Sequence, residues 1–427
     1  MLYQLKSKLS IECWLISVLF IIGLLIRLFH LDGSWLGYDE IFTTIRINHS
    51  LFDTIRLLGH SEFPPLHYII LNLWTHVLGH DEWALRFPSA IFSSLTILVV
   101  YKLGKELFNK EVGLISVLLL TFSPFALNYA QYAKMYALFW FLAAGSFLFF
   151  FRFLKDQKSG SYRLYIIASI LCCYTMYTGF LLLLTQSVIF LFLGEKTRRQ
   201  KWFTGQLIVL AFCAPWIIFF LCSRHHFFIL DSSSAAFDYV AFFERSFLFM
   251  TGSCPDNLMG VTGSYWGGEL NCFLYVFLIL FLLIKAFSYN KRKIGFYFSV
   301  EQYCLLMWII IPTLIYFVFD CFFVHVKLGV RYIGFLQVPL ILLVSSQINH
   351  LYVLIRGILV SLIVVIALSN ICLYFRDNAG YSSLIAENLF ISGKGNDQWW
   401  FGDRALAARL EDIAVRVDWA KMNVEDQ

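Results

Sequence analysis

The chain alternates long apolar runs with short clusters of charged residues. A helix needs roughly 20 apolar residues to cross a bilayer core about 30 Å thick, and about eleven runs approach that length. Barrel strands alternate apolar and polar positions, whereas runs such as 137–151 and 351–374 are apolar on every face. The pattern predicts an all-α polytopic membrane protein with about eleven transmembrane helices, beginning near residues 11, 87, 111, 137, 162, 180, 203, 269, 302, 332 and 354.

Composition removes other classes of protein. The 427 residues are 59% hydrophobic and 14% charged, whereas an average soluble protein has about 25% charged residues. So little polar surface excludes a soluble enzyme, a disordered chain and a fibrous protein. Residues 1–375 hold 27 Lys and Arg against 19 Asp and Glu, and residues 376–427 hold 6 against 9. No basic run interleaved with aromatic residues indicates a nucleic-acid partner, so we expect none.

The basic residues also predict the orientation of the chain. If the N-terminus lies inside, the inner loops hold 18 Lys and Arg and the outer segments hold 8, as the positive-inside rule requires. A transmembrane domain then covers 1–375, with long outer loops at 30–86 and about 222–269. A short acidic tail, 376–427, also faces outside, and its stretch 403–419 has helical spacing of apolar residues.

The first outer loop carries two adjacent carboxylates, Asp39 and Glu40, a few residues beyond the first predicted span. Near a membrane boundary the dielectric is low, and a carboxylate there can act as a general base or bind a cation. The alternative is structural, with Asp39 as the N-cap of a following helix. Further along, Pro65–Leu78 is too short to span and is predicted to lie in the outer interface, with His67 on its first turn.

Three cations follow on the same predicted side. Arg86 begins the second span, and Lys134 stands in a connector of tyrosines that includes Tyr136. Arg331 precedes Tyr332 at another outer helix end, and a guanidinium there can bind phosphate through two hydrogen bonds. Each cation could instead be a membrane anchor, with Lys134 snorkelling to the interface.

Several short motifs occur in a characteristic order: Y-D-E, F-P-P-L-H-Y, L-R-F-P-S-A and A-K-M-Y-A-L. In this order the chain resembles the GT-C glycosyltransferases that use polyprenyl-phosphate sugars, in particular bacterial relatives of protein O-mannosyltransferases and of the lipid A aminoarabinose transferase. The resemblance is best from residue 11 to about 155 and absent from the tail. The family usually has Arg where Lys134 stands.

The resemblance implies an inverting transfer of a sugar from a polyprenyl-phosphate donor to a hydroxyl acceptor, which could be a lipid, a glycan or a protein. By analogy Asp39 is the general base, and Glu40 orients it or holds a divalent cation. Arg331 and Lys134, with Tyr332 and Tyr136, would bind the donor phosphate. The remaining residues assigned to the substrate region are His60, Glu62, His67 and Arg86.

The predicted location is a bacterial inner or plasma membrane, with membrane lipids around the chain and the active site on the extracytoplasmic side. The alternative function is a transporter or flippase of lipid-linked substrates, in which Asp39 and Glu40 bind a coupling ion. A transporter should carry its ionisable residues at mid-membrane depth. Asp39, Lys134 and Arg331 meeting in one place would favour the enzyme.

Overall fold

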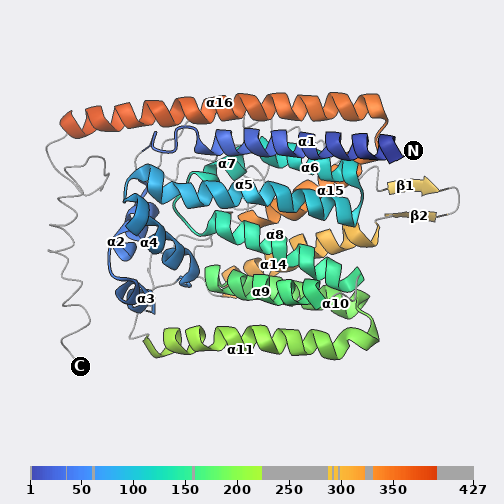
Figure 1. Ribbon diagram of the computed structural model, residues 1–427, viewed down its shortest axis with the longest axis horizontal. Helices are drawn as coiled ribbons and strands as arrows, with labels where there is room; N and C mark the ends of the chain where they lie inside the picture. The colour runs from blue at the N-terminus through green and yellow to red at the C-terminus, as the bar shows by residue number, and fades with distance from the viewer. Residues whose placement is uncertain are drawn as a thin grey trace.

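A computed structural model describes residues 2–34, 36–59, 63–155, 159–223, 287–290, 293–296, 299–322 and 330–391. Long helices lie side by side along one direction (Figure 1). These are α1 (Leu2–Leu28), α5 (Glu82–Leu107), α8 (Tyr136–Lys155), α9 (Ser159–Thr175), α10 (Gly179–Leu193), α11 (Arg199–Ser223), α14 (Val300–Phe322), α15 (Gln337–Asn349) and α16 (Val353–Ile391).

Shorter elements connect them. Three helices between α1 and α5 gather at the end of the bundle opposite the N-terminus (Figure 1): α2 (Tyr38–Ile47), α3 (Leu51–Gly59) and α4 (Leu66–Leu78). The helix α4 covers all but the first residue of the interfacial helix predicted at 65–78. The other short elements are α6 (Lys110–Thr121), α7 (Pro124–Ala130) and the 3-10 turns η1 (Lys196–Arg198), η2 (Val330–Tyr332) and η3 (Gly334–Leu336).

A two-stranded hairpin departs from the expectation of an all-α chain. Strands β1 (Phe287–Asn290) and β2 (Lys293–Phe296) pair antiparallel, with Phe287 opposite Phe296, at the same end of the bundle as the N-terminus (Figure 1). Aromatic and β-branched residues favour strands, but each strand has only 4 residues, too few to give a clear periodic pattern.

Among the described residues, four helices are long and apolar enough to cross a membrane, or five if the bent pair α6–α7 counts as one span. Every predicted run begins in or next to a described helix, except the run from 269, which lies outside the described residues. Several of these helices, such as α10 and α15, have only 15 and 13 residues, below the roughly 20 that a span needs. The total of about eleven spans stays a prediction.

Charged residues separate to the two ends of the bundle. At the end near the N-terminus, Lys105 pairs with Glu12, and Arg152 pairs with Glu106. Arg198 of η1 donates to the carbonyl of Phe153 at 2.6 Å. These contacts join segments that the charge pattern assigned to one side of the membrane.

A buried arginine fixes the break between α6 and α7, which are bent by 61°. Arg27 of α1 is 0% exposed and donates to Ser93 Oγ at 2.8 Å, to the Leu120 carbonyl at 3.0 Å and to the Thr121 carbonyl at 3.3 Å. The last carbonyls of a helix have no partner within it, so the guanidinium satisfies those of α6. Helix α7 then leads into the connector 131–135, which carries Lys134.

Candidate active site

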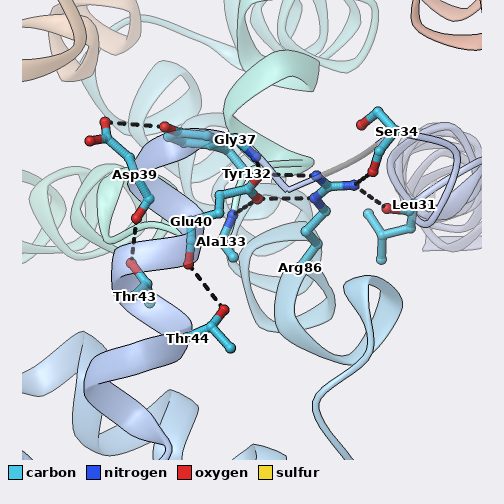
Figure 2. A network of polar contacts seen from close by, with 10 residues as sticks. All are labelled: Leu31, Ser34, Gly37, Asp39, Glu40, Thr43, Thr44, Arg86, Tyr132 and Ala133. Carbon is cyan, nitrogen blue, oxygen red and sulfur yellow. Dashed lines mark hydrogen bonds and ion pairs between the residues drawn. The ribbon is translucent and has the colours of Figure 1, made fainter. Parts of the chain in front are cut away.

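The helix α2 sets Asp39 and Glu40 in different directions. Gly37 is the N-cap of α2, and the Gly37 N–H donates to Glu40 Oε2 at 2.9 Å. The alternative in which Asp39 is the N-cap is therefore wrong, since Asp39 lies inside the helix. Consecutive residues of a helix are rotated by about 100°, and Figure 2 shows Glu40 turned toward Arg86 while Asp39 points toward Tyr132.

Glu40 forms a buried ion pair with Arg86 from α5. Arg86 Nε donates to Glu40 Oε1 at 3.0 Å and Arg86 Nη2 donates to Oε2 at 2.9 Å (Figure 2). The two side chains are 2% and 3% exposed. Arg86 Nη1 also donates to the carbonyls of Leu31 and Ser34 at 2.9 and 2.8 Å. Arg86 thus has a buried acidic partner.

The same carboxylate holds the connector between α7 and α8. The Ala133 N–H donates to Glu40 Oε1 at 2.7 Å, so each oxygen of Glu40 accepts one bond from Arg86 and one from a backbone amide. A carboxylate with both oxygens occupied in this way has little capacity left for a proton or a metal. Glu40 therefore does not fit a cation site shared with Asp39, and its contacts make it a positioning residue.

Asp39 remains partly open to solvent and is 28% exposed. Tyr132 donates its hydroxyl to Asp39 Oδ2 at 3.1 Å, and Arg331 from η2 forms an ion pair with the same oxygen. Residues 39 and 331 are 292 positions apart in sequence. The fold therefore joins the candidate base to the candidate phosphate ligand.

Tyrosine rings surround the Arg331 guanidinium. Its Cζ lies 5.5 Å from the centre of the Tyr332 ring. Tyr332 meets Tyr136 edge-on at 6.3 Å, and Tyr136 stacks on Tyr132 at 6.2 Å between ring centres. Burial and the nearby carboxylates Asp39 and Glu40 raise the pKa of Tyr132 well above its usual value. Tyr132 is therefore a neutral hydrogen-bond donor at physiological pH.

Lys134 is buried rather than snorkelling, since it is 3% exposed. Its Nζ lies 5.2 Å from the centre of the Phe63 ring and 6.0 Å from that of Tyr68. Burial lowers the pKa of Lys134 to about 8, although the field of Asp39 acts in the opposite direction. The sequence alternative of an anchor reaching the interface is thus wrong for this lysine.

His67 faces the protein and not the lipid. It is 4% exposed, and its Nε2 is buried without a hydrogen-bond partner. Burial and the positive charge of Lys134 lower the pKa of His67 to about 3, so the ring is neutral. His60 and Glu62, also assigned to the substrate region, lie outside the described residues. Within the described part of the chain, no group of three or more His, Cys, Asp or Glu could hold a metal ion.

Two residues of the candidate site were not predicted from the sequence. Tyr132 lies in the tyrosine-containing connector next to Lys134 but was not singled out, and it contacts Asp39. Arg46 of α2 lies 5.7 Å from the Phe63 ring centre, beside Lys134. Residues seven apart lie on the same face of a helix. Once a helix from residue 38 is assumed, that spacing relates Arg46 to Asp39.

Comparison with known proteins shows which family and which solved structures the chain resembles. A family described as dolichyl-phosphate-mannose-protein mannosyltransferase matches residues 62–219, which is less than half of the chain. ArnT from Cupriavidus metallidurans in the apo state is 18% identical and has a TM-score of 0.53, covering 82% of this chain and 62% of ArnT. The chain has the fold of the GT-C glycosyltransferases.

Another GT-C structure aligns over almost the whole chain. AglB, an oligosaccharyltransferase from Archaeoglobus fulgidus solved with an inhibitory peptide and a dolichol-phosphate, is 13% identical with a TM-score of 0.53, covering 98% of this chain and 59% of AglB. A curated Aquifex aeolicus protein, described as an uncharacterized protein, is 28% identical over 171 residues, covering 38% of this chain and 34% of that protein. The chain thus spans about a third of this relative and about 60% of the matched structures.

Proposed function

We propose that this chain is a membrane glycosyltransferase that transfers a sugar from a polyprenyl-phosphate donor to a hydroxyl group of a lipid, glycan or protein. One observation carries the proposal: Asp39 of α2 contacts Arg331 of η2 and Tyr132 of the α7–α8 connector. A half-exposed carboxylate beside a guanidinium suits a reaction that removes a proton and releases a phosphate. The GT-C fold supports the same chemistry.

In the proposed reaction Asp39 is the general base. The acceptor oxygen attacks the anomeric carbon of the sugar and forms the new glycosidic bond. The bond from that carbon to the phosphate oxygen breaks, and its electrons leave with polyprenyl phosphate. Asp39 takes the acceptor proton, and attack from the face opposite the phosphate inverts the anomeric centre. Asp39 Oδ1 is the oxygen for this step, since Oδ2 is the oxygen that contacts Tyr132 and Arg331.

The leaving phosphate would be neutralised by Arg331 and Lys134, with hydrogen bonds from Tyr332 and Tyr136. Arg331 is paired with Asp39 in the free protein, so the donor phosphate competes with Asp39 for the guanidinium. When Arg331 turns to the phosphate, Asp39 loses its ion-pair partner, and its carboxylate becomes available to the acceptor hydroxyl. Binding of the donor would thus prepare the base, and no step of this reaction is assigned to a metal.

The placement of charge favours transfer over transport. Helix α2, which carries Asp39 and Glu40, lies with α3 and α4 at one end of the bundle (Figure 1). Inside the helix α1, Arg27 binds a serine and backbone carbonyls, as expected of a structural group. A transporter would instead need ionisable groups at mid-membrane depth.

We also propose the membrane arrangement that the charge pattern predicts: about eleven spans within a domain at 1–375, and the site on the extracytoplasmic side of a bacterial inner membrane. Exposed apolar residues of α4 support its place in the outer interface, since Leu73 is 54% and Val77 80% exposed. Helix α16 runs to Ile391, beyond the proposed start of the tail at 376. The loop 224–269 and the segment 403–419 lie outside the described residues.

The decisive experiment compares cell-surface glycans and lipids by mass spectrometry in cells with the wild-type gene, without it, and with Asp39→Asn. The amide keeps the shape of the side chain but accepts no proton at neutral pH. A glycoform present only with the wild type, and lost in Asp39→Asn at normal protein levels, is the expected result. Identical glycans in all three strains would contradict the proposal. Exposed Asp53→Asn on α3 is the matched control and should retain the glycoform.

A further inference from the structure

Two cations share one aromatic ring beside Asp39. The Arg46 guanidinium lies 5.7 Å from the centre of the Phe63 ring, and Lys134 Nζ lies 5.2 Å from the same centre. Arg46 also follows Asp39 by two turns on the same face of α2. The ring attracts both cations through its negative face, but it carries no net charge.

No described acidic residue neutralises this pair of cations. The described carboxylates of the site are engaged elsewhere, because Asp39 pairs with Arg331 and Glu40 with Arg86. Neither Arg46 nor Lys134 takes part in an ion pair among the described residues. Burial, together with the charge of Arg46, lowers the pKa of Lys134, so the two cations repel each other. Such a pair therefore attracts an anion.

Two buried polar atoms next to these cations also lack partners. His67 Nε2 forms no hydrogen bond, and the Tyr68 hydroxyl forms none of ordinary geometry; the two residues are 4% and 0% exposed. Arg46 and Thr43 both lie close to the Tyr68 hydroxyl. Buried polar atoms are almost always paired with protein or with bound water, so two orphans in one place indicate a site for a polar ligand.

The two orphan atoms differ in the groups that they can bind. The Tyr68 hydroxyl can donate to an anion. The other side of the His67 ring meets the backbone of Ala133, and a neutral imidazole that donates there keeps Nε2 as an acceptor. His67 therefore suits a ligand hydroxyl, while Tyr68, Arg46 and Lys134 suit an anionic group.

We infer that Arg46 and Tyr68 form a second anion-binding subsite, which shares Lys134 with the donor-phosphate site and holds a carboxylate or phosphate on the transferred sugar or on the acceptor, with His67 accepting a neighbouring hydroxyl. The inference rests on the proposed function and names the class of substrate. Arg46, Lys134 and Arg331 carry three positive charges against the one negative charge of Asp39. A donor phosphodiester supplies one more negative charge, and the second anionic group completes the balance.

The test uses the full-length protein purified in detergent and titrated by NMR with three separate probes. Glucuronate carries a carboxylate and hydroxyls, glycerol phosphate carries a phosphate and hydroxyls, and glucose is the neutral analogue of glucuronate. We expect at least one anion to bind roughly tenfold or more tightly than glucose. Arg46→Gln should weaken that anion roughly 10- to 100-fold, the effect of a lost charge-assisted hydrogen bond, and Arg46→Lys should weaken it less.

Controls separate this inference from the proposed function. Arg56→Gln, which removes an exposed arginine of α3, should leave anion affinity unchanged. Undecaprenyl phosphate, titrated in parallel, should bind the wild type and Arg46→Gln equally, which also shows that the variant is folded. Tyr68→Phe removes only the hydroxyl and provides a second test if Arg46→Gln folds poorly.

Each outcome has a defined meaning. Preference for glucuronate assigns the group to an acidic sugar, and preference for glycerol phosphate assigns it to a phosphorylated sugar or acceptor. Equal binding of glucose and both anions, or anion affinity unchanged in Arg46→Gln and Tyr68→Phe, overturns the inference. Failure of undecaprenyl phosphate to bind would overturn the proposed function instead.

Discussion

The Glu40–Arg86 pair gives the most direct test of how the site is held together. Glu40→Gln keeps the size and shape of the side chain but removes its charge. The carboxylate accepts four hydrogen bonds, two from Arg86 and one each from the Gly37 and Ala133 amides. A glutamine has one acceptor oxygen, so its NH₂ group would face two donors. The variant removes the carboxylate that pairs with the buried Arg86 guanidinium.

The cost follows from burial. Both side chains are at most 3% exposed, and removing one partner of a buried ion pair costs about 3–5 kcal/mol. The pair Arg152–Glu106 at the other end of the bundle is the matched control, since its side chains are 33% and 30% exposed. Removing a partly exposed pair costs about 0–1 kcal/mol, so Arg152→Met should have a much smaller effect.

Unfolding of the purified protein by titration with SDS, followed by circular dichroism, measures both costs. The double variant Glu40→Gln with Arg86→Met removes the guanidinium as well as the carboxylate. Its loss in the free energy of unfolding should be smaller than the sum of the losses in the two single variants. The reasoning fails if Glu40→Gln costs no more than Arg152→Met, or if the two substitutions at 40 and 86 are additive. Either result would mean that the pair is more hydrated than its contacts indicate.

Three further predictions concern the donor site and the topology. The variant Arg331→Ala removes the guanidinium and should reduce the rate of transfer roughly 30- to 1000-fold, about 2–4 kcal/mol. Kinetics with a polyprenyl-phosphate sugar measure this rate, and a wild-type rate would make Arg331 a membrane anchor. The pKa of Lys134 is about 8, so its ammonium form is lost as the pH rises. Undecaprenyl phosphate affinity should then fall between about pH 7 and about pH 9, and Lys134→Arg should remove that fall while retaining much of the activity; a fall that persists would exclude Lys134. A cysteine at Ser50 should react with an impermeant reagent in intact cells, whereas one at exposed Thr197 should react only after permeabilisation; the reverse pattern would invert the topology.

Periodicity and charge predicted the helices well because each depends on nearby residues. The runs from 87 and 137 coincide with α5 and α8, and the short run at 65–78 corresponds to α4. The segment 38–59 was not resolved into α2 and α3 because its polar residues interrupt the apolar pattern. The hairpin β1–β2 was missed because short strands give a weak signal.

The roles of neighbouring residues were harder to predict than their importance. Asp39 and Glu40 were selected as a pair, but the sequence could not say which one is buried. Glu40 is the buried one because successive residues of a helix point in different directions and because Arg86, which lies 46 residues after Glu40, is on the side that Glu40 faces. Lys134 was predicted to bind the donor phosphate and His67 to belong to the substrate region, but the sequence did not show that packing of α4 against the connector buries both side chains.

The sequence by itself determined the membrane class, the helical runs and the separation of charge to two sides, because these are properties of composition and local spacing. It also placed Asp39, Lys134 and Arg331 on the same predicted side. Only the tertiary structure decided that Asp39 contacts Arg331, that Glu40 is occupied by Arg86 and Ala133, and that Arg46 joins Lys134 at Phe63. Those contacts depend on how helices and connectors pack across hundreds of residues, and no local pattern encodes the direction in which each side chain then points.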